Sequence, residues 1–116
     1  MTKLEQLRHA IGVLASSSED QILYLCKIGL IDRCNVIDER TNVDELALHF
    51  EDATYLVEAL VNESKLSQLE ATYIEDLKEF LVSLSEERNA EFWTIKALRI
   101  DPRWAQVREL ARKCIL

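Results

Sequence analysis

Apolar residues recur every three or four positions along most of this chain, which is the spacing of one face of an α-helix. The first stripe consists of Leu4, Leu7, Ile11 and Leu14. Just before it, Thr2 followed three residues later by Glu5 has the pattern of a capping box, in which two side chains bond the first amides of a helix. The pattern therefore predicts a helix over residues 3–15.

A second, shorter helix is expected to begin at Ser18, because Gln21 three residues later repeats the capping pattern. Its apolar face consists of Ile22, Leu25 and Cys26. It should end before Gly29, since glycine adopts the left-handed conformation that commonly follows a helix. The next stretch, residues 30–41, has no clear period, and its apolar residues could cover the core from a loop or from a brief helical turn.

The clearest helical pattern starts after Asn42, which together with Glu45 is typical of a helix N-terminus. The inner side of this helix consists of Leu46, Phe50, Ala53, Val57 and Leu60. With a rotation of about 100° per residue, the opposite side consists of Asp44, Leu48, Glu51, Asp52, Tyr55, Glu58 and Ala59. One face is therefore apolar and the other is acidic, with Leu48 and Tyr55 among the carboxylates.

Three further helices are predicted in the C-terminal half of the chain. Ser67 with Glu70 begins the first, whose inner side consists of Leu69, Tyr73, Leu77, Phe80 and Leu84. Asn89 is expected to cap the next, which runs through the sequence FWTIKALR. Asp101 before Pro102 caps the last, because proline tolerates the first helical position and the aspartate accepts bonds from unpaired amides. The buried side of that helix should consist of Trp104, Val107, Leu110, Ala111 and Cys114.

The composition favours helices over strands. The 116 residues include only two glycines and one proline, which leaves few residues for the turns of a multi-stranded sheet. A hydrophobic content of 48% is sufficient for one core. No repeat, low-complexity tract or linker divides the chain. We therefore expect an all-α fold in which residues 1–116 form a single compact bundle of about five to six helices.

The distribution of charge indicates what this domain binds. The formal net charge is −7, and residues 38–79 alone carry −9, from twelve carboxylates against Arg40, Lys65 and Lys78. Nucleic acids and anionic lipids recruit proteins through lysine and arginine, so this segment would repel both. No window approaches the roughly 20 apolar residues of a membrane span, and no export signal is visible. We expect a cytoplasmic protein with a basic protein partner, and no nucleic-acid or membrane partner.

No group of residues indicates catalysis, a cofactor or a metal. The cysteines are odd in number and lack CxxC spacing, so we expect reduced thiols rather than disulfides or a zinc site. They are Cys26, Cys34 and Cys114. His49 lies near Glu45 and Asp52, but there is no HExxH motif and His9 is distant in sequence, so we interpret His49 as a boundary histidine paired with carboxylates. The chain is not expected to be an enzyme, and no catalytic, cofactor-binding or metal-ligating residue is predicted.

The predicted interaction surface joins the acidic face of the third helix to the outer side of the fourth. There, Glu75 and Glu79 form a like-charge pair one turn apart, which mildly destabilises a helix and invites a cationic partner. An aromatic or aliphatic anchor surrounded by charges is typical of an interface. The predicted partner-binding residues are Asp44, Leu48, Glu51, Asp52, Tyr55, Glu58, Glu75, Asp76 and Glu79. Two simpler interpretations stay open: Leu48 and Tyr55 pack under residues 30–41, or the carboxylates form an ordinary solvated face.

Four stretches of the chain resemble small helical immunity proteins, which are encoded beside bacterial contact-dependent growth inhibition systems and related polymorphic toxins. They are SSSEDQILYL at 16–25, VDELALHFEDA at 43–53, AEFWTIKAL at 90–98 and PRWAQVRELARKC at 102–114. The resemblance implies a cytoplasmic protein that binds a toxin domain tightly and blocks its active site or substrate groove. Many such toxins are nucleases with basic clefts, and opposite charges would steer an acidic inhibitor towards them. The alternative is a helical regulatory or structural adaptor, in which a homodimer buries Leu48 and Tyr55.

Overall fold

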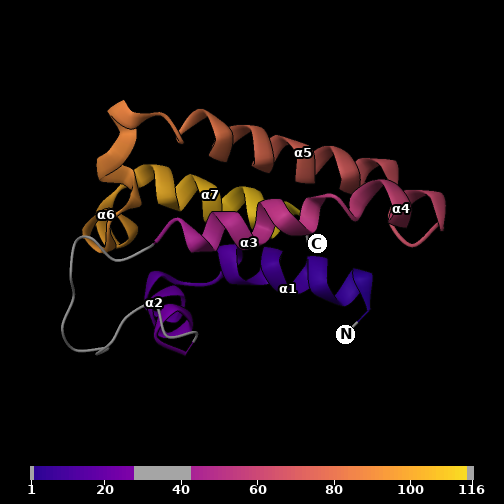
Figure 1. The fold of residues 1–116 in the computed structure, drawn as a ribbon, viewed down its shortest axis with the longest axis horizontal. Helices are drawn as coiled ribbons and strands as arrows, with labels where there is room; N and C mark the ends of the chain where they lie inside the picture. The colour runs from indigo at the N-terminus through magenta and orange to yellow at the C-terminus, as the bar shows by residue number, and fades with distance from the viewer. Residues whose placement is uncertain (1, 28–42, 115–116) are drawn as a thin grey trace.

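Four helices run along the length of the molecule and form its body (Figure 1). They are α1 (Lys3–Ala15), α3 (Glu45–Thr54), α5 (Gln68–Ser83) and α7 (Pro102–Cys114). The shorter elements are α2 (Ser18–Lys27), α4 (Val57–Asn62), the 3-10 helix η1 (Glu87–Trp93) and α6 (Ile95–Ile100). This computed structural model describes residues 2–27 and 43–114, and those ranges contain no β-strand. The predicted all-α fold is thus confirmed.

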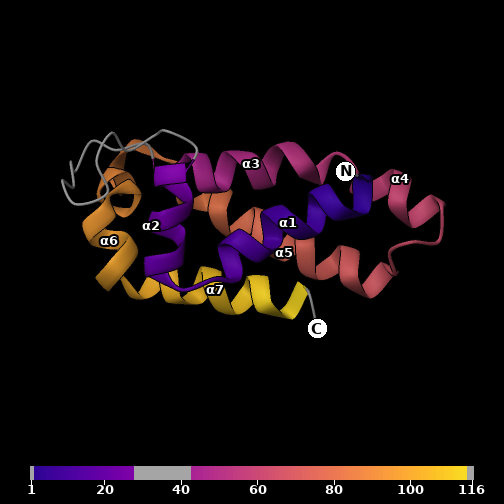
Figure 2. The same cartoon turned by 90° about the horizontal axis from the view of Figure 1, so that it is seen from below.

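Helix α1 is central to the bundle because it packs along both α3 and α7. Figure 2 shows α1 between these two helices, with α5 behind them, and α5 packs mainly against α7. Helices α2 and α6 lie together at one end of the bundle and α4 lies at the other (Figure 1). The radius of gyration is 14.2 Å, close to the value of about 13 Å expected for a compact domain of this length. The predicted compact bundle is therefore also confirmed.

The largest buried side chains meet where α7 packs against η1. The rings of Phe92 and Trp104 are both fully buried and stack with their centroids 4.5 Å apart. The indole Nε1 of Trp104 donates a 2.7 Å hydrogen bond to the carbonyl oxygen of Phe92, so its one polar atom is paired inside the core. Trp104 therefore docks the last helix as the sequence predicted.

Three predicted helix caps are present. The Thr2 hydroxyl accepts a hydrogen bond from the amide of Glu5 at 3.1 Å, and Ser67 does the same for Glu70 at 3.1 Å. An Oδ1 atom of Asp101 accepts from the amide of the second residue of α7 at 2.8 Å. These contacts span only two or three residues of sequence. Local sequence is therefore sufficient to specify them.

Three other cap predictions have different outcomes. The second helix is capped by Ser17, whose hydroxyl accepts from the amide of Asp20 at 3.2 Å, so the prediction of Ser18 was wrong by one residue. Asn89 lies inside η1 and caps nothing there; Thr94 caps α6 instead, accepting from the amide of Ala97 at 3.1 Å. The predicted cap at Asn42 lies outside the described residues.

The predicted third helix is divided into α3 and α4, which explains why the described residues contain seven α-helices rather than five to six. At the division, the amide of Leu56 donates to the carbonyl oxygen of Ala53 at 3.1 Å, a three-residue step in place of the α-helical four. This tighter step turns the side chain of Leu56 into the core, where it is 6% exposed. Tyr55 lies at the division.

The inner side of the predicted fourth helix is partly wrong. Leu69 is 62% exposed, and Tyr73 and Phe80 are only half-buried at the edge of the core. The buried residues of α5 are Ile74, Leu77 and Leu81, and Leu84, which follows the helix, is buried as predicted. Two apolar stripes run side by side on this helix, and contact with α7 selects the second of them. Spacing alone does not distinguish two adjacent stripes.

One buried polar network joins the N-terminal and C-terminal halves. Gln21, expected to be part of a cap, is instead fully buried, and its amide nitrogen donates to the carbonyl oxygens of Val13 at 3.2 Å and Leu14 at 3.1 Å. Its Oε1 accepts from the guanidinium of Arg108 at 3.1 and 3.2 Å, and Arg108 also donates to the carbonyl oxygen of Leu98. Burial lowers the pKa of Arg108 from its ordinary value. The network fixes α1, α2, α6 and α7 relative to one another.

Candidate functional site

The acidic face of α3 and α4 surrounds two exposed anchors. Tyr55 is 77% exposed and Leu48 is 41% exposed, so both side chains are available to a partner. The surrounding carboxylates are Asp44, Glu51, Asp52 and Glu58, of which only Glu51 is half-buried. The outward orientation predicted from helical rotation is therefore correct. The alternative, packing under residues 30–41, concerns residues outside the described ranges.

This acidic face has no lysine or arginine within its own segment. Between Thr41 and Ser64 the chain contains six carboxylates and neither lysine nor arginine. Two of the six are paired: Glu45 lies 3.3 Å from His49, and Glu63 lies 3.4 Å from Lys3. Among the described residues, no ion pair involves the four carboxylates that surround Tyr55 and Leu48. Their charge is therefore available to attract a cation.

The three predicted residues of α5 are exposed as well, but nothing brings them into the same hollow as the residues of α3. Glu75, Asp76 and Glu79 all face solvent and have no ion-pair partner in the part of the chain that the structure describes. Burial and, to a smaller extent, the negative charge of Asp76 together raise the pKa of Cys114 to about 11. Asp76 therefore lies towards the end of α7, whereas the acidic face lies on α3 and α4.

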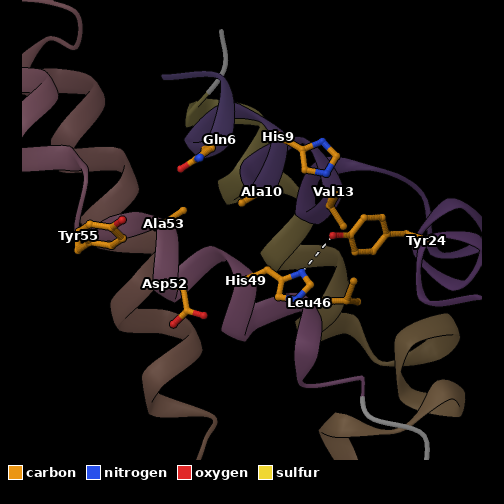
Figure 3. Close-up of a pocket in the computed structure, with 10 residues that line it drawn as sticks. All are labelled: Gln6, His9, Ala10, Val13, Tyr24, Leu46, His49, Asp52, Ala53 and Tyr55. Carbon is orange, nitrogen blue, oxygen red and sulfur yellow. Dashed lines mark hydrogen bonds between the residues drawn. The ribbon is translucent and has the colours of Figure 1, made fainter. Parts of the chain in front are cut away.

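A groove of about 310 Å³ lies between α1 and α3 and continues to α2 (Figure 3). Its floor includes Ala10 and Ala53, whose short side chains leave this space open. Of the predicted partner-binding residues, only Asp52 and Tyr55 line it. The full lining, which Figure 3 shows as sticks, is Gln6, His9, Ala10, Val13, Tyr24, Leu46, His49, Asp52, Ala53 and Tyr55. We call this space the α1–α3 groove.

The α1–α3 groove brings together both histidines and a tyrosine from three helices. The hydroxyl of Tyr24 on α2 lies 3.0 Å from Nδ1 of His49 on α3, and Nε2 of His49 lies 3.3 Å from Glu45. His9 on α1 approaches the other side of Tyr24, with ring centroids 5.9 Å apart. The expected pairing of His49 with a carboxylate is confirmed. The proximity of His9 was missed, because its only signal would have been the pairing of α1 with α3.

The protonation state of Tyr24 bears on its contact with His49 and, beyond it, Glu45. Burial, followed by the negative charge of Glu45, raises the pKa of Tyr24 above its ordinary value, so its hydroxyl stays protonated at neutral pH. The phenol proton is therefore available for the 3.0 Å contact with Nδ1 of His49, whose other ring nitrogen, Nε2, faces Glu45. The three side chains therefore act as a polar clamp between α2 and α3.

The groove has no arrangement typical of metal binding or nucleophilic catalysis. Within residues 2–27 and 43–114, no three histidine, cysteine or acidic side chains are placed so that they could hold a metal ion. Cys114 is buried away from the groove and is held protonated by its raised pKa. None of the described helices is both long and apolar enough to cross a membrane. What the described surface offers is carboxylates, exposed aromatic rings and hollows between helices.

Comparison of this chain with models of protein families, with curated protein sequences and with solved structures finds no match. The resemblance to helical immunity proteins therefore depends on the sequence stretches described above. The acidic face and the α1–α3 groove are the two most distinctive features of the described surface, and they are the basis for a proposed function.

Proposed function

We propose that this chain is an immunity protein, which binds and neutralises a basic toxin domain, a nuclease in particular, through its acidic face. The supporting observation is a row of carboxylates on the same outward side of α3 and α4 as Tyr55. Four of them have no ion-pair partner in the described part of the chain, and Tyr55 itself is 77% exposed. Exposed tyrosines at the centre of a charged rim are common anchors of tight interfaces.

The physical argument for a basic partner rests on electrostatics. A nuclease binds the phosphates of its substrate through lysine and arginine, and helical carboxylates present negative charge to the same groups. Opposite charges would raise the rate of association by about 10- to 1000-fold at low salt. Close charge pairs at an interface of this kind can couple by about 1.5–7 kcal/mol. Such an inhibitor needs no catalytic group of its own.

The alternative, a helical adaptor that dimerises through Leu48 and Tyr55, is physically less favourable. Two copies of the acidic face placed against each other would bring like charges together without a lysine or arginine from the same segment between them. Light scattering distinguishes the two: a stable dimer that dissociates after Tyr55→Glu would support the adaptor. If the chain is a monomer at all concentrations tested, the homodimeric adaptor is excluded.

The decisive experiment is a neutralisation assay. The chain is coexpressed with the C-terminal domain of each protein encoded next to it, and growth is scored with and without the chain. We expect one neighbouring domain to be toxic alone and harmless together with this chain. If no neighbouring domain is both toxic and neutralised, the proposal fails.

With the purified toxin domain, association kinetics test the surface. Replacing Glu51 and Asp52 by lysine should slow association by about tenfold or more and weaken its dependence on salt. The matched control makes the same change of charge at Glu91 and Glu109, which are exposed on η1 and α7. Equal effects of the two double variants would show that only net charge matters, and unchanged kinetics for the first would exclude this surface.

A further inference from the structure

A second hollow adjoins the α1–α3 groove on the other side of Tyr24. It has a volume of about 380 Å³ and lies between α1 and α2, where Gly12, Asp20 and Leu23 line it. His9, Val13 and Tyr24 line both spaces, and the rings of His9 and Tyr24 form the ridge between them. The groove and this hollow therefore make one concave surface across α1, which we call the double hollow.

The charge of the double hollow is complementary to a cationic chain. Asp52 lies in the groove and Asp20 lies in the hollow beyond the ridge, and no lysine or arginine lines either space. Aromatic rings line the same spaces as these carboxylates: Tyr55 lines the groove with Asp52, and Tyr24 lines the hollow with Asp20. A guanidinium or ammonium group gains both from a carboxylate and from the face of an aromatic ring.

The open space over Gly12 is a second observation, independent of charge, that favours contact with a partner at this place. Glycine destabilises the interior of a helix, yet a Cβ atom at Gly12 would meet nothing within 4 Å. Neither the helical backbone nor the packing of the described residues therefore requires glycine at this position. The position lies on the wall of the hollow, where the absence of a side chain lets another polypeptide approach the helix closely.

We infer that the double hollow receives a basic, extended segment of the partner, which crosses α1 over Gly12 with one cationic side chain near Asp52 and another near Asp20. Two hollows separated by the ridge of His9 and Tyr24 suit successive side chains of an extended chain better than one compact ligand. The exposed Leu23, at 53%, offers an apolar contact beside the second cation. This inference rests on the proposed function and adds the partner segment that the acidic face alone does not specify.

A defined peptide tests the inference. The probe is a short fluorescein-labelled peptide of alternating arginine and serine, and its control replaces each arginine by citrulline, which has nearly the same shape but no charge. Binding is followed by fluorescence anisotropy at low salt. We expect saturable binding of the arginine peptide and none of the citrulline peptide. Failure of the arginine peptide to bind the wild-type chain would overturn the inference.

Two variants locate the site, and each has a matched control. Gly12→Gln fills the hollow without changing charge, and its control, Ala105→Gln, adds the same side chain to an exposed position of α7. Asp20→Asn removes one charge, and its control is Glu109→Gln on α7. We expect each test variant to weaken peptide binding by about tenfold and each control by less than about twofold. Thermal unfolding confirms that all four variants are folded.

The outcomes separate this inference from the proposed function. If Gly12→Gln binds the peptide as the wild-type chain does, the segment does not lie in the double hollow. If Gly12→Gln also neutralises the toxin domain fully while the lysine variants at Glu51 and Asp52 fail, the immunity function stands and this inference is overturned. Loss of neutralisation in Gly12→Gln but not in Ala105→Gln supports both.

Discussion

The substitution Gly12→Ala should stabilise this protein, because the structure has room for the added methyl group. Gly12 lies inside α1, three residues before its last residue, Ala15. Alanine is favoured over glycine in a helix by about 0.5–1 kcal/mol, because glycine loses more backbone freedom on folding. The new methyl group would meet no atom within 4 Å, so no steric term opposes this gain.

The gain corresponds to a small but measurable change in melting temperature. The entropy of unfolding of a 116-residue domain is about 0.24 kcal/mol per kelvin near its midpoint. A gain of about 0.5–1 kcal/mol therefore raises Tm by about 2–4 °C. Circular dichroism at 222 nm during heating measures Tm, and urea unfolding gives the free energy directly.

The matched control is the reverse change on another helix. Ala105 is exposed on α7, so Ala105→Gly should lower the free energy of unfolding by about the same amount. If Gly12→Ala leaves Tm unchanged or lowers it while Ala105→Gly behaves as expected, the space over Gly12 is filled in the folded chain. That result would show that Gly12 is not open to an added side chain. It would therefore refute the predicted gain in stability and would also contradict the approach of a partner segment over Gly12.

Three further predictions concern the fold and the clamp. Arg108→Met should lower the free energy of unfolding, measured in urea, by about 2–4 kcal/mol, because it leaves buried acceptors on Gln21 and Leu98 without donors. The double variant with Gln21→Leu should lose about 1–2 kcal/mol less than the sum of the two single variants. Strict additivity would argue against the network. Ser67→Ala should cost about 1 kcal/mol by the same assay, and no loss would mean that the cap contributes nothing. The pKa of Tyr24 is raised above its ordinary value of 10.0 in the folded chain, so Tyr24 stabilises the fold below pH 10 and this contribution is lost as the pH rises through the folded pKa. The Tm of Tyr24→Phe should therefore fall less steeply from pH 9 to 11.5 than the Tm of the wild-type chain. Identical slopes for the two proteins would contradict the assignment.

The acidic face and the double hollow have complementary tasks in the proposed complex. Carboxylates on an exposed helix raise the rate of encounter and act over several ångströms of solvent. A concave surface that holds a particular segment slows dissociation instead, because its contacts must be broken together. Asp52 and Tyr55 belong to both surfaces, so they lie where long-range attraction leads into close contact.

Sequence alone determined the features that depend on residues one helical turn apart. The caps at Thr2, Ser67 and Asp101 are local hydrogen bonds, so their spacing was sufficient to predict them. The outward orientation of Tyr55 and Leu48 follows from the rotation per residue of a helix and holds in the structure. The all-α fold follows from the same periodicity and from the scarcity of glycine and proline.

Only the tertiary structure decided which helix faces meet. Leu69 belongs to a good apolar stripe but stays exposed, because α7 packs against the neighbouring stripe of α5. The sequence pattern predicts Gln21 as part of a helix cap. In the structure its side chain is buried, where Arg108, far along the chain, donates a hydrogen bond to it. His9 and His49 flank Tyr24 because α1 lies beside α3. The pairing of helices depends on the packing of whole surfaces, and periodicity within each helix carries no information about its neighbour.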